Sequence, residues 1–211
     1  MEITWLGHSC FRLKGRDAAA VTDPCGPGSG YKLAQLTGDV VTVSNSHPHH
    51  NDVELVGGEP VILDGPGEYE VKGVGVTGFR TDLPEEGKER LHNTAYMIEI
   101  DDITVCHLGD LANMLPTEHL EITKDIDVLL VPVGGHCTIG PAQAAQVISQ
   151  LGAKVVIPMH YATDVSSMEL EQLDGFLREM GVTEAQPQAR LNVTQSSLPP
   201  EPTVTVLQYR K

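Results

Sequence analysis

Three histidines lie within four consecutive positions of this chain, at His47, His49 and His50. They directly follow residues 40–44, a run rich in β-branched side chains that predicts a strand. Three imidazoles on one short loop repel one another when they are protonated, and metal binding is the commonest reason for such crowding. Imidazole nitrogens are ligands that zinc, iron and manganese accept. We therefore interpret this loop as part of a metal site.

Two more candidate ligands follow predicted strands further along the chain, namely Asp110 and His160. Loops at the ends of neighbouring strands can converge at one edge of a sheet, where carboxylates and imidazoles can share a metal. The candidate metal ligands are therefore His47, His49, His50, Asp110 and His160. Two other histidines, His8 and His136, also follow strand ends. Their positions are equally compatible with lining the metal site and with a structural role.

Two further features border this predicted site. Asp23 follows a predicted strand and precedes a proline, so it fits either a hydrogen bond to a ligand histidine or an ordinary turn. The glycine-rich residues 26–30 lack the Gly-Lys-Ser/Thr sequence of a phosphate-binding loop. We interpret them as a turn that can lie beside the site.

The first half of the chain reads as a series of short strands that must position these side chains. The predicted strands are residues 1–6, 10–13, 18–22, 40–44, 61–63, 68–71, 74–77, 95–100 and 103–107. Asp101 and Asp102 form a two-residue hairpin turn between the last two. This half is therefore predicted to be dominated by β-structure.

The second half alternates between strands and helices. Strands are predicted at residues 128–132, 155–159 and 203–209, and helices at residues 141–151 and 167–180, with weaker helix signals at residues 30–36 and 117–122. Strands that alternate with helices through short loops predict parallel strands covered by helices. We therefore expect an α/β fold with a mixed sheet region, in one domain over residues 1–211.

Composition excludes several classes of protein. The chain is 40% hydrophobic, which excludes a disordered protein, and its charge of 14 − 29 = −15 argues against a nucleic-acid partner. No apolar run reaches the roughly 18 residues of a membrane span, and no signal peptide is recognisable, so we expect no membrane partner and a cytoplasmic location. Four separated cysteines without a Cys-x-x-Cys pair are interpreted as reduced thiols, with a disulfide or a thiolate metal ligand as alternatives.

Several short motifs together resemble a known family. In chain order they are WLGHSCF, TDP, DGPGEY, HLGD, PVGG and PMHY. Their order and spacing resemble the metallo-β-lactamase superfamily, and within it the small bacterial Zn-dependent hydrolases of this fold, over nearly the whole chain. The resemblance implies an αβ/βα sandwich of two mixed β-sheets flanked by helices, with the metal site at one edge.

The chain departs from the superfamily's H-x-H-x-D-H motif. In the register that we prefer, Asn45 takes the first His position, His47 the second, His49 the Asp position and His50 the last His position. The competing register starts the motif at His47 and places an Asn and an Asp at its last two positions. In either register, two of the four positions are altered.

The remaining ligands of the motif set the expected metal count. The His expected within residues 78–84 is missing, although Asp82 could replace it as an oxygen ligand. Asp110 and His160 match the bridging Asp and the final His. Because amides are poor zinc ligands, we expect the first metal position to be weak or empty and the second to be held by His49, His50, Asp110 and His160. We predict one zinc ion, with two ions, manganese or iron as alternatives.

The resemblance implies a metal-dependent hydrolase in which a metal-bound hydroxide attacks an ester, lactone or phosphoester of small-molecule size. The alternative is a catalytically inactive metal-binding or regulatory descendant of the fold. A third option, a di-iron redox role, is disfavoured by the altered first position. A homo-oligomer is compatible with the resemblance, because related small proteins often self-associate.

Overall fold

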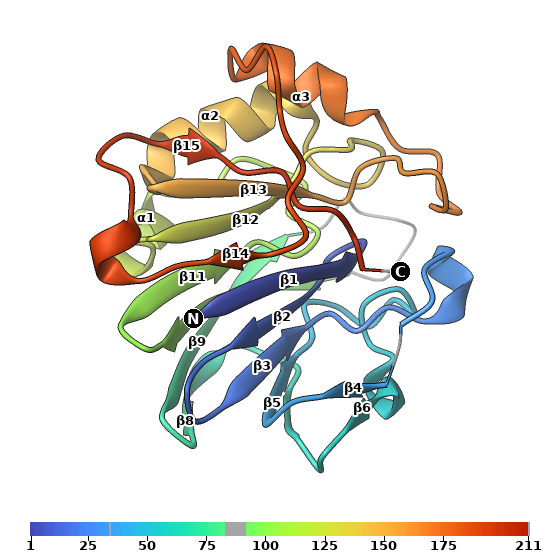
Figure 1. Cartoon of the computed structure of the whole chain (residues 1–211), viewed down its shortest axis with the longest axis vertical. Helices are drawn as coiled ribbons and strands as arrows, with labels where there is room; N and C mark the ends of the chain where they lie inside the picture. Colours follow the sequence, from blue (N-terminus) through green and yellow to red (C-terminus); the bar gives the residue numbers. More distant parts are fainter. Residues whose placement is uncertain (34, 83–91, 211) are drawn as a thin grey trace.

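The computed structural model describes residues 1–33, 35–82 and 92–210, and two mixed β-sheets form its centre (Figure 1). The first sheet has the strand order β14-β1-β2-β3-β5-β7. Its strands are β1 (Glu2–Gly7), β2 (Cys10–Lys14), β3 (Ala19–Thr22), β5 (Val40–Thr42), β7 (Val61–Leu63) and β14 (Leu191–Asn192). Strands β3, β5 and β7 run parallel to one another, whereas β1, β2 and β14 pair antiparallel.

The second sheet has the strand order β15-β13-β12-β11-β10-β9-β8. Its strands are β8 (Gly67–Val71), β9 (Val74–Asp82), β10 (His92–Ile100), β11 (Ile103–His107), β12 (Val128–Pro132), β13 (Val155–Met159) and β15 (Thr203–Val204). Strands β11, β12, β13 and β15 are parallel. A separate pair is formed by β4 (Leu36–Thr37) and β6 (Val56–Gly57).

The helices follow strands of the second sheet in the chain. They are α1 (Thr117–Ile122), α2 (Pro141–Leu151) and α3 (Leu173–Glu179), with 3-10 turns at Pro27–Ser29, Val53–Leu55 and Gln195–Ser197. Helix α2 packs on α3 and on β12, and both helices lie on the outer side of that sheet in Figure 1. No helix in the described part of the chain is long and apolar enough to cross a membrane.

The core lies between the sheets because both contribute apolar side chains to one buried cluster. Trp5 of β1 and Leu129 of β12 are among its members, at 2% and 0% exposure. The hydroxyl of Tyr96 in β10 donates to the carbonyl oxygens of Val43 and Leu63, at 2.9 and 3.0 Å, and so ties the two sheets together. This contact anchors the chain directly before the histidine-rich loop.

One predicted helix is wrong, and another begins later than predicted. No helix forms in the described part of residues 30–36, because Gly30 adopts a left-handed backbone (φ +91) and Leu36 pairs in β4. The helix expected at residues 167–180 begins only at Leu173. The preceding segment uses its backbone elsewhere: the amide of Ser167 donates to Ser29, and that of Glu171 to Gly134.

The remaining elements largely match their predictions. Helix α2 and the buried strands β12 and β13 have the predicted bounds. Asp101 and Asp102 both have positive φ, as a two-residue hairpin turn requires. The last strand is shorter than predicted and ends at Val204.

Candidate metal centre

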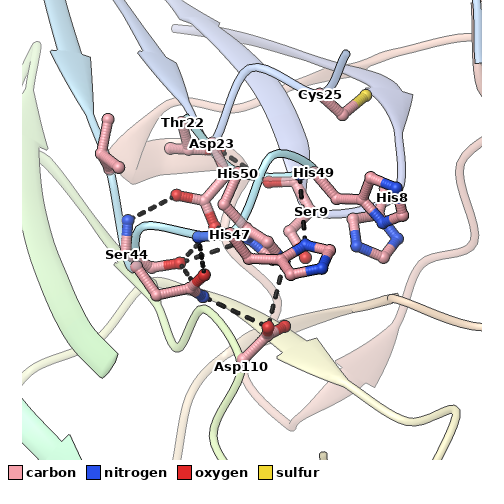
Figure 2. A network of polar contacts seen from close by, with 12 residues as sticks. His8, Ser9, Thr22, Asp23, Cys25, Ser44, His47, His49, His50 and Asp110 are labelled. Atoms are coloured by element: carbon pink, nitrogen blue, oxygen red, sulfur yellow. Dashed lines mark hydrogen bonds and ion pairs between the residues drawn. The ribbon is translucent and has the colours of Figure 1, made fainter. Parts of the chain in front are cut away.

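The histidine and aspartate side chains of the candidate site lie where several strands end, at one edge of the two sheets. His8 follows β1, Asp23 follows β3 and the loop carrying His50 follows β5. On the second sheet, Asp110 follows β11 and His160 follows β13. Figure 2 shows the side chain of His50 between Asp23 and Asp110, with His8 close to it. Because parallel strands place their carboxyl ends at the same edge, this convergence follows from the topology.

Three buried imidazoles form the heart of the cluster, and they come from both sheets. His8, His50 and His160 have 2%, 1% and 1% exposure, and their ligand atoms all lie within 4.8 Å of one another. The ring centroids of His8 and His160 are 4.2 Å apart, and the amide of His160 donates to the carbonyl of His8 at 3.3 Å. Such a nitrogen-rich set is typical of a transition-metal site.

The backbone around this cluster is strained. His8, Asp23 and His160 adopt left-handed conformations, with φ of +51, +39 and +53. Such conformations cost on the order of 1–3 kcal/mol each in residues other than glycine, and they persist only when the surrounding structure enforces them. Strain at three strand ends of one edge therefore makes this edge a candidate functional site.

Asp110 lies against two of the imidazoles. Its Oδ2 is 3.0 Å from His50 Nε2, and its Oδ1 is 3.3 Å from His160 Nε2. The backbone amide of Asp110 donates to Asn93 Oδ1 at 2.9 Å. The preceding residue, Gly109, lies so close to Asn93 that an added Cβ would be 2.4 Å from the same oxygen. This hydrogen bond holds the backbone of Asp110 and so helps to position its carboxylate.

Asp23 orients His50 from behind. Its Oδ2 accepts a hydrogen bond from His50 Nδ1 at 2.7 Å, which leaves Nε2 as the atom facing the cluster. The carboxylate also accepts from the amide and hydroxyl of Ser44, at 2.7 and 2.6 Å. Of the two roles open in the sequence, the hydrogen bond to a histidine is the one observed. A carboxylate that fixes the tautomer and orientation of a ligand imidazole is a common companion of metal sites.

The three imidazoles of the cluster differ in their protonation. Burial lowers the pKa of His8 and of His160, so both rings are neutral at pH 7 and offer lone pairs. Burial alone would lower the pKa of His50, but the carboxylates of Asp110 and Asp23 raise it to about 10. Burial would raise the pKa of Asp110, but His50 and His160 hold it well below its usual range. The chain alone thus keeps a positive charge where a cation would lie, and metal binding would displace that proton.

Several buried polar atoms of the cluster lack a partner. Among the described residues, His8 Nε2, both ring nitrogens of His160 and Asp110 Oδ1 are buried and make no hydrogen bond. His160 Nε2 and Asp110 Oδ1 are near each other but lack hydrogen-bond geometry. Buried polar atoms without partners are costly. One ion would satisfy His8 Nε2, one ring nitrogen of His160 and Asp110 Oδ1. The donor set therefore fits a divalent metal.

The predicted ligands separate into two groups. His50, Asp110 and His160 come together, whereas His47 is exposed and His49 is half-buried at the rim. His49 packs beside His8, with ring centroids 5.6 Å apart, and an added Cβ on Gly28 would lie 3.6 Å from its Nε2. The glycine-rich turn thus borders the site, as expected.

Asn45 takes the first position of the motif in the preferred register. Its amide donates to Asp110 Oδ2 at 3.2 Å, and its carbonyl oxygen accepts from the amide of His47 at 3.0 Å. The amide therefore stands where it supports the carboxylate and shapes the loop. Another ligand was expected within residues 78–84. Strand β9 covers this segment up to Asp82, and residues 83 and 84 lie outside the described residues.

His8 is the residue that sequence reasoning left undecided and that the structure places in the centre. The only signal for it was its position after a strand, which His136 shares, and His136 is exposed. The other histidine near the site, His107, is fully buried behind it and contacts the carbonyl of Ser9 through Nε2 at 2.9 Å. Neither of these two histidines belongs to the three-imidazole set.

Replacing Asp23 with asparagine is expected to weaken zinc binding by roughly 10- to 100-fold, the usual effect of losing the carboxylate behind a ligand histidine. The buried carboxylate accepts from His50 and from Ser44, and the amide of an asparagine cannot accept all of these bonds. Competition with a chromophoric chelator measures the affinity. Asp39→Asn, which removes an exposed ion pair with Lys72, is the matched control and should bind zinc like the wild type. Equal affinities in the two variants would exclude the orienting role.

Comparison with known proteins identifies the family. Residues 2–160 match the family described as the beta-lactamase superfamily domain. The chain belongs to the metallo-β-lactamase superfamily. The predicted resemblance and the predicted sandwich fold are therefore confirmed.

Relatives of this superfamily member are named as metal-dependent hydrolases. A protein from Thermotoga maritima, described as a Zn-dependent hydrolase of the superfamily, is 39% identical with a TM-score of 0.81, over 98% of this chain and 97% of its own. UPF0173 metal-dependent hydrolases from Methanoculleus marisnigri and Thermococcus onnurineus are 33% and 30% identical, over 77% of this chain and 82% and 85% of theirs. These names describe the relatives.

Proposed function

We propose that this chain is a metal-dependent hydrolase whose metal centre is built on His8, His50, Asp110 and His160. The observation that carries this proposal is the buried set of three imidazoles beside a fixed carboxylate, with ring nitrogens and a carboxylate oxygen that lack partners. The family context supports it, because the relatives compared above are named as hydrolases that depend on a metal. Zinc suits this set of imidazole and carboxylate ligands.

The roles of the individual residues follow from their contacts. When bound, the metal supplies Lewis-acid polarisation of the substrate and a water nucleophile of lowered pKa. Asp23 holds His50 with Nε2 toward the centre, and Asn93 holds the backbone of Asp110. Asn45 donates to Asp110 Oδ2 and keeps that carboxylate oriented.

The rim of the site suits substrate contact and proton transfer. His47 and His49 lie at the open side, with ring centroids 4.6 Å apart, and only His47 is exposed. Burial and the neighbouring His47 lower the pKa of His49, which therefore serves at neutral pH as an uncharged proton acceptor. We propose small esters, lactones or phosphoesters as substrates, since a polarising metal and a water nucleophile serve all three.

The test combines metal content with a substrate screen. Protein purified without a metal-affinity column is analysed for zinc, iron and manganese, and is then assayed on a panel of esters, lactones and phosphodiesters. At least one equivalent of metal, with hydrolysis that stops on chelation and returns with zinc, is the expected result. A fully metal-loaded protein that is inert on the whole panel would favour the catalytically inactive alternative. Protein that binds no metal even after reconstitution would overturn the proposal.

A further inference from the structure

His107 is a buried, titratable side chain that the proposed function does not use. It is the last residue of β11, the strand that leads to Asp110, and none of its surface is exposed. It belongs to none of the donor sets formed by the described residues. Its ring lies edge-on to Phe11 of the first sheet, with ring centroids 6.4 Å apart. The ring therefore reaches from the second sheet to the first, behind the metal centre.

The hydrogen bond of His107 fixes its tautomer. Nε2 lies 2.9 Å from the carbonyl oxygen of Ser9, and a carbonyl oxygen only accepts, so Nε2 carries the proton. Burial lowers the pKa of His107, so the ring is neutral at pH 7 and Nδ1 carries no proton. Nδ1 is buried and has no hydrogen-bond partner among the described residues. The ring is therefore a donor on one side and an unpaired acceptor on the other.

Packing alone does not account for a histidine at this position. A buried nitrogen without a partner costs free energy, and a leucine would fill much of the same space without that cost. Nε2 of His107 also lies 4.0 Å from Asp23 Oδ2, the oxygen that accepts from His50 Nδ1. The proton on Nε2 thus adds positive partial charge beside the carboxylate that orients His50. Both observations indicate that the donated proton is the reason for this side chain.

The acceptor of this bond, the carbonyl oxygen of Ser9, is shared by two donors. The hydroxyl of Thr22 also donates to it, at 3.0 Å, and Thr22 is the last residue of β3, directly before Asp23. Ser9 itself directly follows His8. One carbonyl oxygen therefore connects the three segments that carry His8, Asp23 and Asp110.

The turn at His8 needs such restraint because its backbone is strained, with φ of +51. The carbonyl of His8 accepts from Trp5 Nε1 at 2.9 Å and from the amide of His160 at 3.3 Å. A left-handed backbone outside glycine persists only when the surrounding contacts enforce it. The bond from His107 to Ser9 adds a contact from β11 to this turn.

We propose that His107 is a positioning residue that sets the separation between His8 and Asp110 through its hydrogen bond to Ser9. This inference rests on the proposed function, because it assumes that a metal binds between these two side chains. His107 ties the His8 turn of the first sheet to the end of β11, and Asp110 follows the same strand end. Loss of the bond lets the turn relax, so His8 Nε2 moves away from the metal although its ring is retained.

Two substitutions separate the donated proton from the volume of the ring. His107→Gln keeps an N–H donor at the end of its side chain, whereas His107→Leu fills the space without one. In His107→Leu, zinc affinity should fall roughly 10-fold, at the lower end of what groups behind a metal ligand cost, and the visible bands of bound Co²⁺ should shift. His107→Gln should restore the wild-type cobalt spectrum and most of the zinc affinity. Metal-free His107→Leu should melt close to the metal-free wild type, because the lost hydrogen bond is offset by removal of the unpaired nitrogen.

Cys106→Ala is the matched control for packing in the same strand. Cys106 is fully buried, and successive side chains of a strand point to opposite faces, so its truncation should lower the melting temperature and leave the cobalt spectrum unchanged. The same result in His107→Leu would overturn the positioning role and leave the proposed function standing. Equal spectral shifts in His107→Gln and His107→Leu would overturn the donated hydrogen bond as its basis. Failure of the wild type to bind cobalt or zinc at all would overturn both proposals.

Nitrogen NMR of the wild-type histidines does not depend on the folding of any variant. The His107 ring is expected to show a protonated Nε2 and an unprotonated Nδ1, both with and without zinc, because the carbonyl of Ser9 accepts only from a protonated nitrogen. A proton on Nδ1 in place of Nε2 would overturn the proposal. So would a loss of the Nε2 proton when zinc binds, since His107 would then be a ligand itself.

Discussion

The variant His160→Asn is expected to lose its metal and, with it, hydrolytic activity. His160 is buried, belongs to the three-imidazole set and lies 3.3 Å from Asp110 through Nε2. Asparagine tolerates the left-handed backbone at this position, so the substitution removes the ligand with little added backbone strain. Because amides are poor zinc ligands, zinc affinity and kcat/KM should each fall by more than about 100-fold, the upper range for losing an outer partner alone.

Chelator competition gives the zinc affinity, and circular dichroism confirms that the variant is folded. His47→Ala is the matched control, because this exposed histidine belongs to the same predicted ligand set but lies outside the buried cluster. Its zinc affinity should stay within about twofold of the wild type, as for most surface substitutions. Equal losses in the two variants would return His47 to the ligand set. Full zinc binding by His160→Asn would remove His160 from it.

Removing the metal is expected to lower the melting temperature substantially. Binding to the folded state at a thousandfold excess over Kd contributes about 4 kcal/mol of stability. A domain of about this size shifts by roughly 2–4 °C for each kcal/mol, so the difference between the zinc-saturated and metal-free proteins should be about 8–16 °C. The physical reason is that the metal satisfies His8 Nε2 and one ring nitrogen of His160, buried atoms that have no hydrogen-bond partner among the described residues.

Differential scanning calorimetry on the dialysed protein, with and without zinc, measures this shift. The His160→Asn variant provides the control, because its melting temperature should not respond to zinc. Magnesium at the same concentration should stabilise the wild type far less, since it prefers oxygen ligands and keeps its waters. An unchanged melting temperature in zinc-saturated wild type would contradict a buried metal site that stabilises the folded chain.

The structure shows how a buried cluster forms beside the histidine-rich loop. Asn45, which takes the first histidine position in the preferred register, donates to Asp110. His8 follows β1, which is separated from β5 by β2 and β3 in the first sheet, and it adds an imidazole to the cluster. The centre thus keeps three buried imidazoles, although the motif loop supplies only one of them.

The local pattern of the sequence determined the strands, helix α2 and three members of the cluster. Short β-branched runs bounded by Gly, Pro and Asp predict strands well, and they placed His50, Asp110 and His160 directly after strand ends. The order of the motifs also identified the superfamily, now confirmed. These features depend on neighbouring residues, so local periodicity and spacing were sufficient to find them.

Local patterns failed where distant backbone competes with a helix. Residues 167–172 were predicted to be helical, but the amides of Ser167 and Glu171 donate to the carbonyls of Ser29 and Gly134, which lie far away in the chain. Gly30 likewise adopts a left-handed backbone against Val165, where an added Cβ would be 1.8 Å from the carbonyl oxygen. Neither contact can be read from the periodicity of one segment, because both partners are brought together only by folding.

The membership of the buried cluster depends on the tertiary structure. Sequence reasoning placed His49 at the Asp position of the motif, and the structure leaves its side chain half-buried at the rim, since successive side chains on a loop point in different directions. His8 lies far from the motif, and the packing of the two sheets brings it to the same edge. Spacing along a chain determines which residues end a strand, whereas a donor set depends on distances between side chains, and those exist only once both sheets have packed.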